Sequence, residues 1–282
     1  MTREEISTAP TASPRTKAVK TSRYRANSTT TTCAAPIQIP YTPRDPRDGL
    51  APYIISPSAH PPSIVLKETP TSVFIRDAFP KALVHALLLP RDPEKTMLHP
   101  FEAFKDEGFL AQVRADAEEL KGLVARELRR KICGRGTVAG GGGVNWGAEV
   151  RVGVHAGPSM NHLHVHVISR EGFSDRVKKR VHYSALLPHP DPNSFNTAFF
   201  VPLDELPLRG DDPRWEHHER ARLLKMDYTC WRCGRGFKNS FVGIKQHIAE
   251  EFVEWKKALL EAEGGGDRGA ASSQFDASSS SV

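Results

Sequence analysis

The feature that most constrains this chain is a run of three histidines at every second position, in the stretch HLHVHVIS (162–169). Successive side chains of a β-strand point to opposite faces, so a strand would place His162, His164 and His166 on one face. The apolar residues between them would then face the core. The alternation therefore predicts a half-buried strand with a row of imidazole rings on its open face.

Three explanations compete for such a row: a metal site, a wet strand surface and catalysis. Neighbours on one strand face lie about 7 Å apart, too far to converge on one ion with bonds of about 2 Å. A chance surface would need an uncommon residue at strict spacing. A neutral imidazole is a nucleophile near pH 7, and its second nitrogen can be held by a neighbour. The row therefore favours one nucleophilic histidine flanked by two that orient it and neutralise phosphate charge.

The segments around this strand predict an α+β domain. Two apolar β-like runs, 72–79 and 82–90, are joined by a short loop and predict a hairpin. Apolar residues recur every three or four positions over 101–131, which predicts a helix that ends at Gly134. Residues 149–156 alternate as a further strand. The order strand–strand–helix–strand–strand predicts an antiparallel sheet with a covering helix.

Composition divides the chain into four parts. Residues 1–60 are rich in Ser, Thr, Pro and Ala and predict a disordered, basic leader, because they have little apolar surface to bury. Residues 61–212 hold the predicted catalytic domain and 213–263 a second unit, linked by a Pro-rich connection. Residues 264–282 read as a disordered tail.

Charge and cysteine content narrow the class of protein. The chain has 39 Lys+Arg against 33 Asp+Glu, a net charge of +6, which fits a polyanionic partner but is shared by many proteins. It contains no apolar run of about 18 residues and no apolar signal core, so we expect no membrane span. Four cysteines do not make a disulfide framework, which favours a reducing compartment such as the nucleus or cytosol.

A Cys-x2-Cys pair in the second unit predicts a zinc site. Cys230 and Cys233 can supply two thiolates, and His247 lies in a helical stretch. The position one turn later, where a second histidine is usual in a finger, is Glu251, and a carboxylate can replace imidazole on zinc. Glu250 would point about 100° away and is the weaker choice. The alternative is a helical hairpin with two incidental thiols.

The same unit suggests a grip on a nucleic-acid backbone. Phe237 and Ile244 match the apolar pair of a ββα finger. One finger reads about 3 base pairs, too few for a regulatory site, so phosphate contacts are more plausible. The basic run RVKKR (176–180) lies close in sequence to the histidine row, although a charge run is often only a solvated surface. The predicted DNA contacts are Lys178, Lys179, Arg180, Lys238 and Lys245.

The His-φ-His-φ-His pattern, where φ is apolar, resembles the signature of the histidine-triad nucleotide hydrolases and transferases. The wider stretch HAGPSMNHLHVHVIS (155–169) is similar to the aprataxin branch, which has an extra histidine before a Pro-Ser-Met loop. Residues 74–90 resemble the nucleotide-binding hairpin of that fold, and Ser-Phe-Asn-Thr (194–197) also resembles aprataxin. The likeness covers roughly residues 62–260. It implies a histidine-triad (HIT) fold with a small C-terminal zinc finger, for which fungal members use a Cys-Cys-His-Glu ligand set.

The resemblance also implies catalytic roles. His164 would attack the α-phosphorus of a bound AMP group and form a covalent AMP–histidine intermediate. His162 and His166 would orient it and contact phosphate oxygens, and His155 would protonate the leaving oxygen. Imidazolium and backbone N–H groups can offset the phosphate charge, so no catalytic metal is expected beside the structural zinc.

Nucleotide contacts follow from the same resemblance. Asp77 would bind the ribose hydroxyls, although it could be only a turn residue. His85 is expected beside the phosphate or behind the triad, and could alternatively be a hydrogen-bonded core histidine. The other implied contacts are Phe74, Ile75 and Leu83 in the adenine pocket, and Ser159 and Met160 in a loop that cradles phosphate and adjacent DNA.

The implied function is a nuclear DNA-repair hydrolase that removes AMP from 5′-adenylated ends left by abortive ligation. Its partner would be nicked or 5′-adenylated double-stranded DNA, its product AMP, and related caps such as a guanylated 3′ end could also serve. One alternative is an enzyme of the same fold acting on dinucleoside polyphosphates or AMP phosphoramidates, which leaves the finger unexplained. Another is a DNA-binding adaptor with a vestigial triad.

Overall fold

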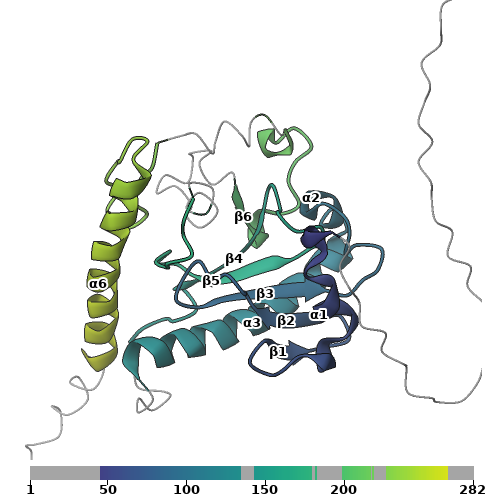
Figure 1. Cartoon of the computed structure of the whole chain (residues 1–282), viewed down its shortest axis with the longest axis horizontal. Coiled ribbons are helices and arrows are strands. Elements are labelled where there is room, and N and C mark those ends of the chain that lie inside the picture. The colour runs from purple at the N-terminus through teal and green to yellow at the C-terminus, as the bar shows by residue number, and fades with distance from the viewer. Residues whose placement is uncertain are drawn as a thin grey trace, which may run out of the picture. The chain divides into compact units, whose positions relative to one another are not determined.

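The computed structural model describes residues 45–134, 143–179, 182, 199–216, 218 and 227–265 (Figure 1). Its centre is an antiparallel six-stranded sheet in the order β1-β2-β3-β5-β4-β6. The strands are β1 (Val65–Glu68), β2 (Ser72–Arg76), β3 (His85–Pro90), β4 (Val150–His155), β5 (Val165–Ser169) and β6 (Phe200–Pro202). β2 and β3 form the predicted hairpin, with Val73 opposite Leu89. The predicted α+β fold is confirmed.

The predicted long helix is divided near its start. A short helix, α2 (Pro100–Ala103), precedes α3 (Glu107–Cys133). The division falls where the side chain of Asp106 accepts the backbone N–H of Phe109 and caps α3. α3 ends as predicted at Gly134, whose φ of 88° suits a residue without Cβ.

The two faces of the sheet bury different side chains. α3 packs along one face (Figure 1), where Leu120 and Leu128 join Phe74 and Val165 in the main core. On the opposite face Ile75 and its neighbours form a second apolar cluster. Each large apolar side chain removed from water contributes about 1.5–3 kcal/mol, so the face under α3 is fixed strongly. His164 and His166 are thereby turned to the other face.

The strand that carries the histidines is shorter than predicted. β5 begins at Val165, so only His166 of the three lies within it. The preceding residues bond to segments outside the sheet. The N–H of Asn161 donates to Arg47 O (2.9 Å), and the N–H of Leu163 donates to Thr96 O (2.7 Å). Leu163 is nevertheless buried in the core. The predicted alternation of buried and open side chains therefore extends to Leu163, although the strand hydrogen bonds begin only at Val165.

The prediction of a disordered leader is wrong for residues 45–60. They form η1 (Pro46–Asp48), α1 (Ala51–Ile55) and η2 (Pro57–Ala59), each with a proline at its first or second position, where a fixed φ favours a helical turn. Leu50 is buried in the cluster that includes Ile75. The few apolar residues of this segment thus pack against the sheet, and the overall composition of residues 1–60 does not predict this local order.

Several predictions fall outside the described residues. They concern residues 1–44 of the leader, residues 266–282 of the tail, Arg180 and the Ser-Phe-Asn-Thr stretch 194–197.

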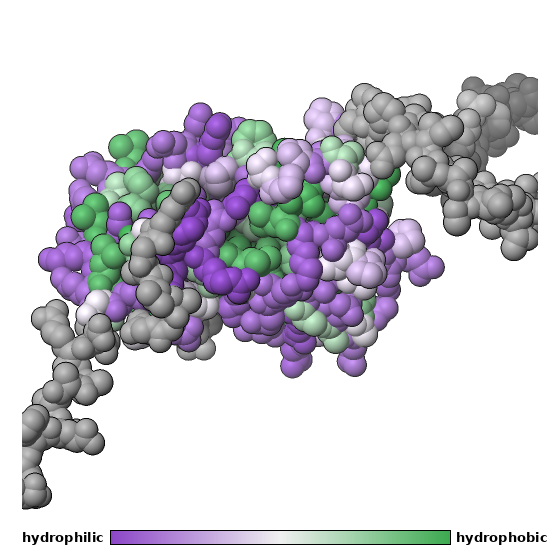
Figure 2. All heavy atoms as spheres, turned by 90° about the horizontal axis from the view of Figure 1, so that it is seen from below, coloured by the Kyte–Doolittle hydropathy of each residue, from purple (hydrophilic) through white to green (hydrophobic). Residues whose placement is uncertain are grey.

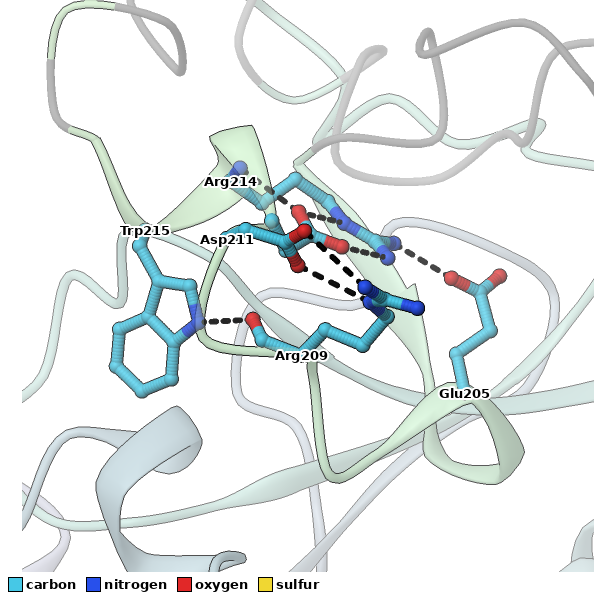
Figure 3. A network of polar contacts seen from close by, with 6 residues as sticks. Glu205, Arg209, Asp211, Arg214 and Trp215 are labelled. Carbon is cyan, nitrogen blue, oxygen red and sulfur yellow. Dashed lines mark hydrogen bonds and ion pairs between the residues drawn. The ribbon is translucent and has the colours of Figure 1, made fainter.

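The Pro-rich connection is folded where it is described, from residue 199. It contains β6, η4 (Leu203–Glu205) and η5 (Pro213–Trp215). Figure 3 shows a polar network that links Glu205, Arg209, Asp211, Asp212, Arg214 and Trp215. The Trp215 ring meets Phe101 of α2 edge-on at 5.3 Å. The connection is therefore held against the catalytic domain.

The second unit is a compact knuckle followed by α6 (Phe241–Gly265). Within its described residues, one bridge between Thr229 and Gly236 stands in place of the two strands of the predicted ββα finger. α6 is joined to the catalytic domain by indole bonds in both directions. Trp255 Nε1 donates to Glu149 Oε2 (2.8 Å), and Trp146 Nε1 donates to Glu263 Oε2 (3.0 Å).

One face of the molecule carries both apolar and hydrophilic side chains (Figure 2). Figure 2 shows one face on which apolar side chains gather in a central hollow, surrounded by hydrophilic ones. Among the described residues, no helix combines the length and the apolar character that crossing a membrane requires.

Candidate functional site

A cavity of about 840 Å³ opens on the sheet face opposite α3. Its size suits a nucleotide. α1, β2, β3, β4 and the segment around β5 contribute to its walls. The predicted residues in its lining are Ile75, Asp77, His85, His155, Ser159, Met160, His164 and His166.

His164 is held as a neutral ring with one nitrogen available. Its Nδ1 lies 2.7 Å from the carbonyl oxygen of His162. A carbonyl oxygen only accepts, so Nδ1 carries the proton and Nε2 keeps a lone pair. Burial lowers the pKa of His164, which keeps the ring uncharged near neutral pH. The geometry therefore presents Nε2 as a nucleophile at the cavity.

His162 orients His164 through its backbone and does not line the cavity with its ring. Its Nδ1 lies 4.0 Å from Asp48 Oδ1, and Asp48 is fixed by a bond from Asn161 Nδ2 (2.7 Å). His162 precedes β5, so the strand ladder does not hold it. The prediction of an orienting role agrees with the carbonyl contact to His164, and His162 is not among the residues that line the cavity.

His85 lies directly behind His166, one of the two positions predicted for it. Its Nε2 is 2.9 Å from His166 Nδ1. Its Nδ1 accepts the N–H of Lys81 (3.3 Å) and lies 3.4 Å from Asp77 Oδ2. Burial lowers the pKa of His85 to about 4 and that of His166 well below its usual value, so both rings are neutral.

This chain of contacts leaves one buried donor of His166 for a ligand. When Lys81 N–H donates to Nδ1 of His85, His85 Nε2–H donates to His166 and His166 carries its own proton on Nε2. That Nε2 is buried and has no hydrogen-bond partner among the described residues. Buried polar groups are normally satisfied, and a phosphate oxygen in the cavity would accept this bond.

His155 completes the histidine cluster from the end of β4. Its ring lies 3.9 Å from that of His166, centroid to centroid, and 5.4 Å from Phe199. It lines the same cavity as His164, where a proton donor to a leaving group would need to lie.

Asp77 is a turn residue that also lines the cavity. Its Oδ1 accepts the N–H of Phe79 (2.6 Å), as a turn residue does, and the side chain also lines the cavity. The turn holds the carboxylate in place, so the structural role prepares the predicted ribose contact.

Phe74 and Leu83 do not line the cavity, which corrects their predicted place in the adenine pocket. Phe74 is fully buried under α3, because it alternates with Ile75 and must face the other way. Leu83 packs against the same core, and its N–H donates to the buried carboxylate of Glu171. Burial raises the pKa of Glu171 to about 7.

Other residues supply the walls that were assigned to Phe74 and Leu83. Leu50 and Tyr53 come from the segment that we assigned to the leader. Together with Ile54 they have the spacing of one helix face, and this pattern could have indicated an ordered helix there. Lys81 brings a cation to the lining, and desolvation lowers its pKa. Phe199 closes the cavity beside His155.

The four predicted zinc ligands converge in the knuckle. Suitable atoms of Cys230, Cys233, His247 and Glu251 all lie within 4.8 Å of one another. Cys233 Sγ is 3.1 Å and Glu251 Oε1 is 3.3 Å from His247 Nε2. Glu250 lies 3.8 Å from the other ring nitrogen and is largely exposed. Two sulfurs, one nitrogen and one oxygen in this arrangement fit a structural zinc ion, with Glu251 as the fourth ligand.

The predicted DNA contacts lie on two exposed stretches. Lys178 and Lys179 are exposed on the loop after β5, and Lys238 and Lys245 are exposed in the finger. The first loop reaches the cavity through His182, whose Nδ1 is 3.2 Å from the N–H of Lys178 and which lines the cavity.

The fold and the site define a HIT protein with a C-terminal zinc finger. A family model for the HIT domain matches residues 58–173, and a model for the C2HE / C2H2 / C2HC zinc-binding finger matches residues 196–254. The chain belongs to the aprataxin family. It is 34% identical over 215 residues to the aprataxin-like protein of Schizosaccharomyces pombe, covering 74% of this chain and 82% of the relative.

Other comparisons agree with this assignment. The aprataxin-like protein of Saccharomyces cerevisiae is 32% identical, over 73% of this chain and 95% of its own length. The crystal structure of the aprataxin ortholog Hnt3 in complex with DNA superposes with a TM-score of 0.59 at 30% identity, covering 76% of this chain and 98% of that one.

Proposed function

We propose that this protein is a DNA-repair hydrolase that removes AMP from 5′-adenylated ends of double-stranded DNA. The observation that carries the proposal is His164, which is neutral, held at Nδ1 by the His162 carbonyl, and placed at a nucleotide-sized cavity. Membership of the aprataxin family supports DNA as the substrate, since its relative Hnt3 was solved in complex with DNA.

In the first step, Nε2 of His164 attacks the α-phosphorus of the AMP group. A P–N bond forms, and the bond from phosphorus to the oxygen of the DNA 5′-phosphate breaks. His155 gives its proton to that leaving oxygen, and His166 Nε2–H donates to a non-bridging phosphate oxygen. DNA with a 5′-phosphate is the first product.

In the second step, water attacks the phosphorus of the AMP–histidine. The P–N bond breaks, AMP leaves, and His164 returns to its neutral state. His155, which has lost its proton, accepts one from the attacking water, so protons balance over the cycle. Lys81 and His166 offset phosphate charge, and we propose that the chemistry needs no catalytic metal; equal rates with and without added Mg²⁺ would support this.

The finger and the basic loop would hold the duplex. Lys178, Lys179, Lys238 and Lys245 are exposed cations on either part of the chain. Contacts to phosphate give affinity without sequence preference, which suits an enzyme that must act at any nick. A nuclear location follows as a further proposal, and imaging of a fluorescent fusion of the full chain tests it.

The central experiment compares two substrates. AMP release is measured from a 5′-adenylated nicked duplex and from a diadenosine polyphosphate at equal concentration. We expect kcat/KM to favour the duplex by at least about 10²-fold, since only the duplex engages the lysines. Equal turnover of the dinucleotide without DNA binding would instead indicate a small-nucleotide hydrolase.

The covalent step needs a separate test. The reaction with substrate labelled in its AMP group is stopped by acid and denaturant, and the label is located by peptide mapping. We expect the label on His164 in the unaltered chain and no label in H164A. Label on another residue would contradict the mechanism, and unchanged AMP release by H164A would leave the triad vestigial and favour the adaptor alternative.

A further inference from the structure

The ligand set of the finger carries more negative charge than a set with two histidines. Two thiolates and one carboxylate bring three negative charges to an ion with two positive ones, whereas two thiolates and two imidazoles would be balanced. Excess charge in a half-buried site is unfavourable unless a cation lies near. With Glu251 as a ligand, the site therefore needs a nearby cation, which it would not need with a histidine at the same position.

Arg232, between the two cysteines, lies where it can meet that need. Its Nη1 donates to Glu251 Oε2 at 2.6 Å. The other carboxylate oxygen, Oε1, is the one that lies 3.3 Å from His247 Nε2, among the ligand atoms. The guanidinium thus occupies the oxygen that the metal site does not use, and leaves Oε1 turned inward.

The same residue also contacts a second ligand through its backbone. The N–H of Arg232 donates to Cys230 Sγ at 3.4 Å, which is a bond to sulfur. Glu251 is well shielded, with 14% of its side chain exposed, while Arg232 is one-third exposed. A salt bridge on an open surface is worth little, but this one is anchored at both ends and touches two ligands.

We propose that Arg232 is a positioning residue of the zinc site. Its guanidinium turns Glu251 so that Oε1 faces the ion, and it balances the charge that a carboxylate ligand adds. The two residues form a coupled pair: Arg232 matters because the fourth ligand is a glutamate. This inference concerns metal binding, so it stands or falls separately from the deadenylation proposed above.

The test measures zinc affinity of the full chain by competition with a chelator of known affinity. We expect R232A to weaken zinc binding by about 10- to 100-fold, the usual effect of removing an outer partner of a ligand. The matched control is R235A, since Arg235 lies on the same exposed knuckle and contacts Phe237. R235A should stay within about twofold of the unaltered chain. An affinity unchanged in R232A would overturn the proposal.

A second background isolates the charge argument. In E251H the fourth ligand is neutral, so R232A should then cost no more than about threefold. The same loss in both backgrounds would show that Arg232 acts without Glu251 and would overturn the proposal. If R232A cannot be purified, R232K and R232Q are compared instead. R232K keeps the positive charge, so we expect it to bind zinc more tightly than R232Q. Binding by R232Q that is equal to or tighter than binding by R232K would contradict the proposal.

Cobalt provides a spectroscopic measurement of the same site. Co²⁺ in place of zinc absorbs visible light with a pattern set by its ligands and their geometry. We expect the spectrum of R232A to change and that of R235A to match the unaltered chain. Identical spectra for all three would contradict a role for Arg232 in directing Glu251.

Discussion

The cavity and the zinc knuckle both depend on buried histidines, but the two regions use the imidazole ring in opposite ways. In the cavity, the ring nitrogens bond to a carbonyl or to one another, and the remaining nitrogens of His164 and His166 are kept for a ligand. In the knuckle, His247 Nε2 joins three other donor atoms around one point. Convergent donors bind a metal, whereas donors arranged in a chain conduct a proton or hold a nucleophile.

A mixed group at the cavity shows why distance alone does not decide between these uses. Asp77, His85 and His166 also have suitable atoms within 4.8 Å of one another. However, His85 turns Nδ1 toward Asp77 and Nε2 toward His166, so its ring lies between the two. The three side chains are therefore arranged one behind another, as a chain of contacts that is called the relay below.

The largest expected effects come from removing one key histidine in each region and measuring both activity and zinc content. H164A should lower deadenylation by at least about 10³-fold and leave the zinc content unchanged, because the nucleophile has no substitute. H247A should remove zinc and unfold the knuckle, since structural zinc contributes on the order of 10 kcal/mol to folding. Metal analysis and AMP release measure the two outcomes. Loss of zinc in H164A would break the comparison.

The relay should contribute less than the nucleophile. H85Q removes the ring behind His166, so the proton of His166 is no longer fixed on Nε2. We expect kcat to fall by about 10- to 100-fold with little change in KM. Steady-state kinetics on adenylated nicked DNA check this. H99Q serves as the control, because His99 caps α2 and bonds to Ala156 O outside the relay. A rate for H85Q equal to that of the unaltered chain would reduce His85 to a core residue.

Acid should destabilise the cavity through the same rings. The folded-state pKa of His85 is about 4, below the usual 6.5, so the unfolded chain takes up a proton first as the pH falls. The free energy of unfolding should therefore drop by roughly 3 kcal/mol between pH 6.5 and 4 on account of His85. Urea unfolding across this range should show a smaller drop for H85Q. The finger loses metal in acid in both chains, so the difference between them is the measurement.

The smallest effects concern the attachment of α6. W255F leaves Glu149 Oε2 without its indole donor, and we expect a loss of about 1–2 kcal/mol in the free energy of unfolding. W215F removes a similar bond to a backbone carbonyl in the exposed connection (Figure 3), and should cost less than about 1 kcal/mol. Chemical denaturation compares the two. A larger effect for W215F would place the main anchor in the connection instead.

Local spacing predicted correctly many of the side chains that the structure brings together at the two sites. Alternation around His164 predicts its strand-like placement, and Cys-x2-Cys with His247 and Glu251 at i and i+4 predicts the ligand set that the structure brings together. Both are short-range patterns, in which backbone geometry fixes direction within a turn or two. Prediction failed for Phe74, because alternation separates it from Ile75 without saying which of the two faces the cavity.

The sequence by itself determined that one histidine is flanked by two others at strand spacing, and that two thiolates, an imidazole and a carboxylate can meet in a knuckle. Only the tertiary structure decided that part of residues 45–60 lines the cavity, that the His162 carbonyl contacts His164, and that His85 lies behind His166. The physical reason is that periodicity reports which side chains share a face, whereas the element covering that face comes from a distant part of the chain. α3 covers one face of the sheet, and α1 and the cavity lie on the other.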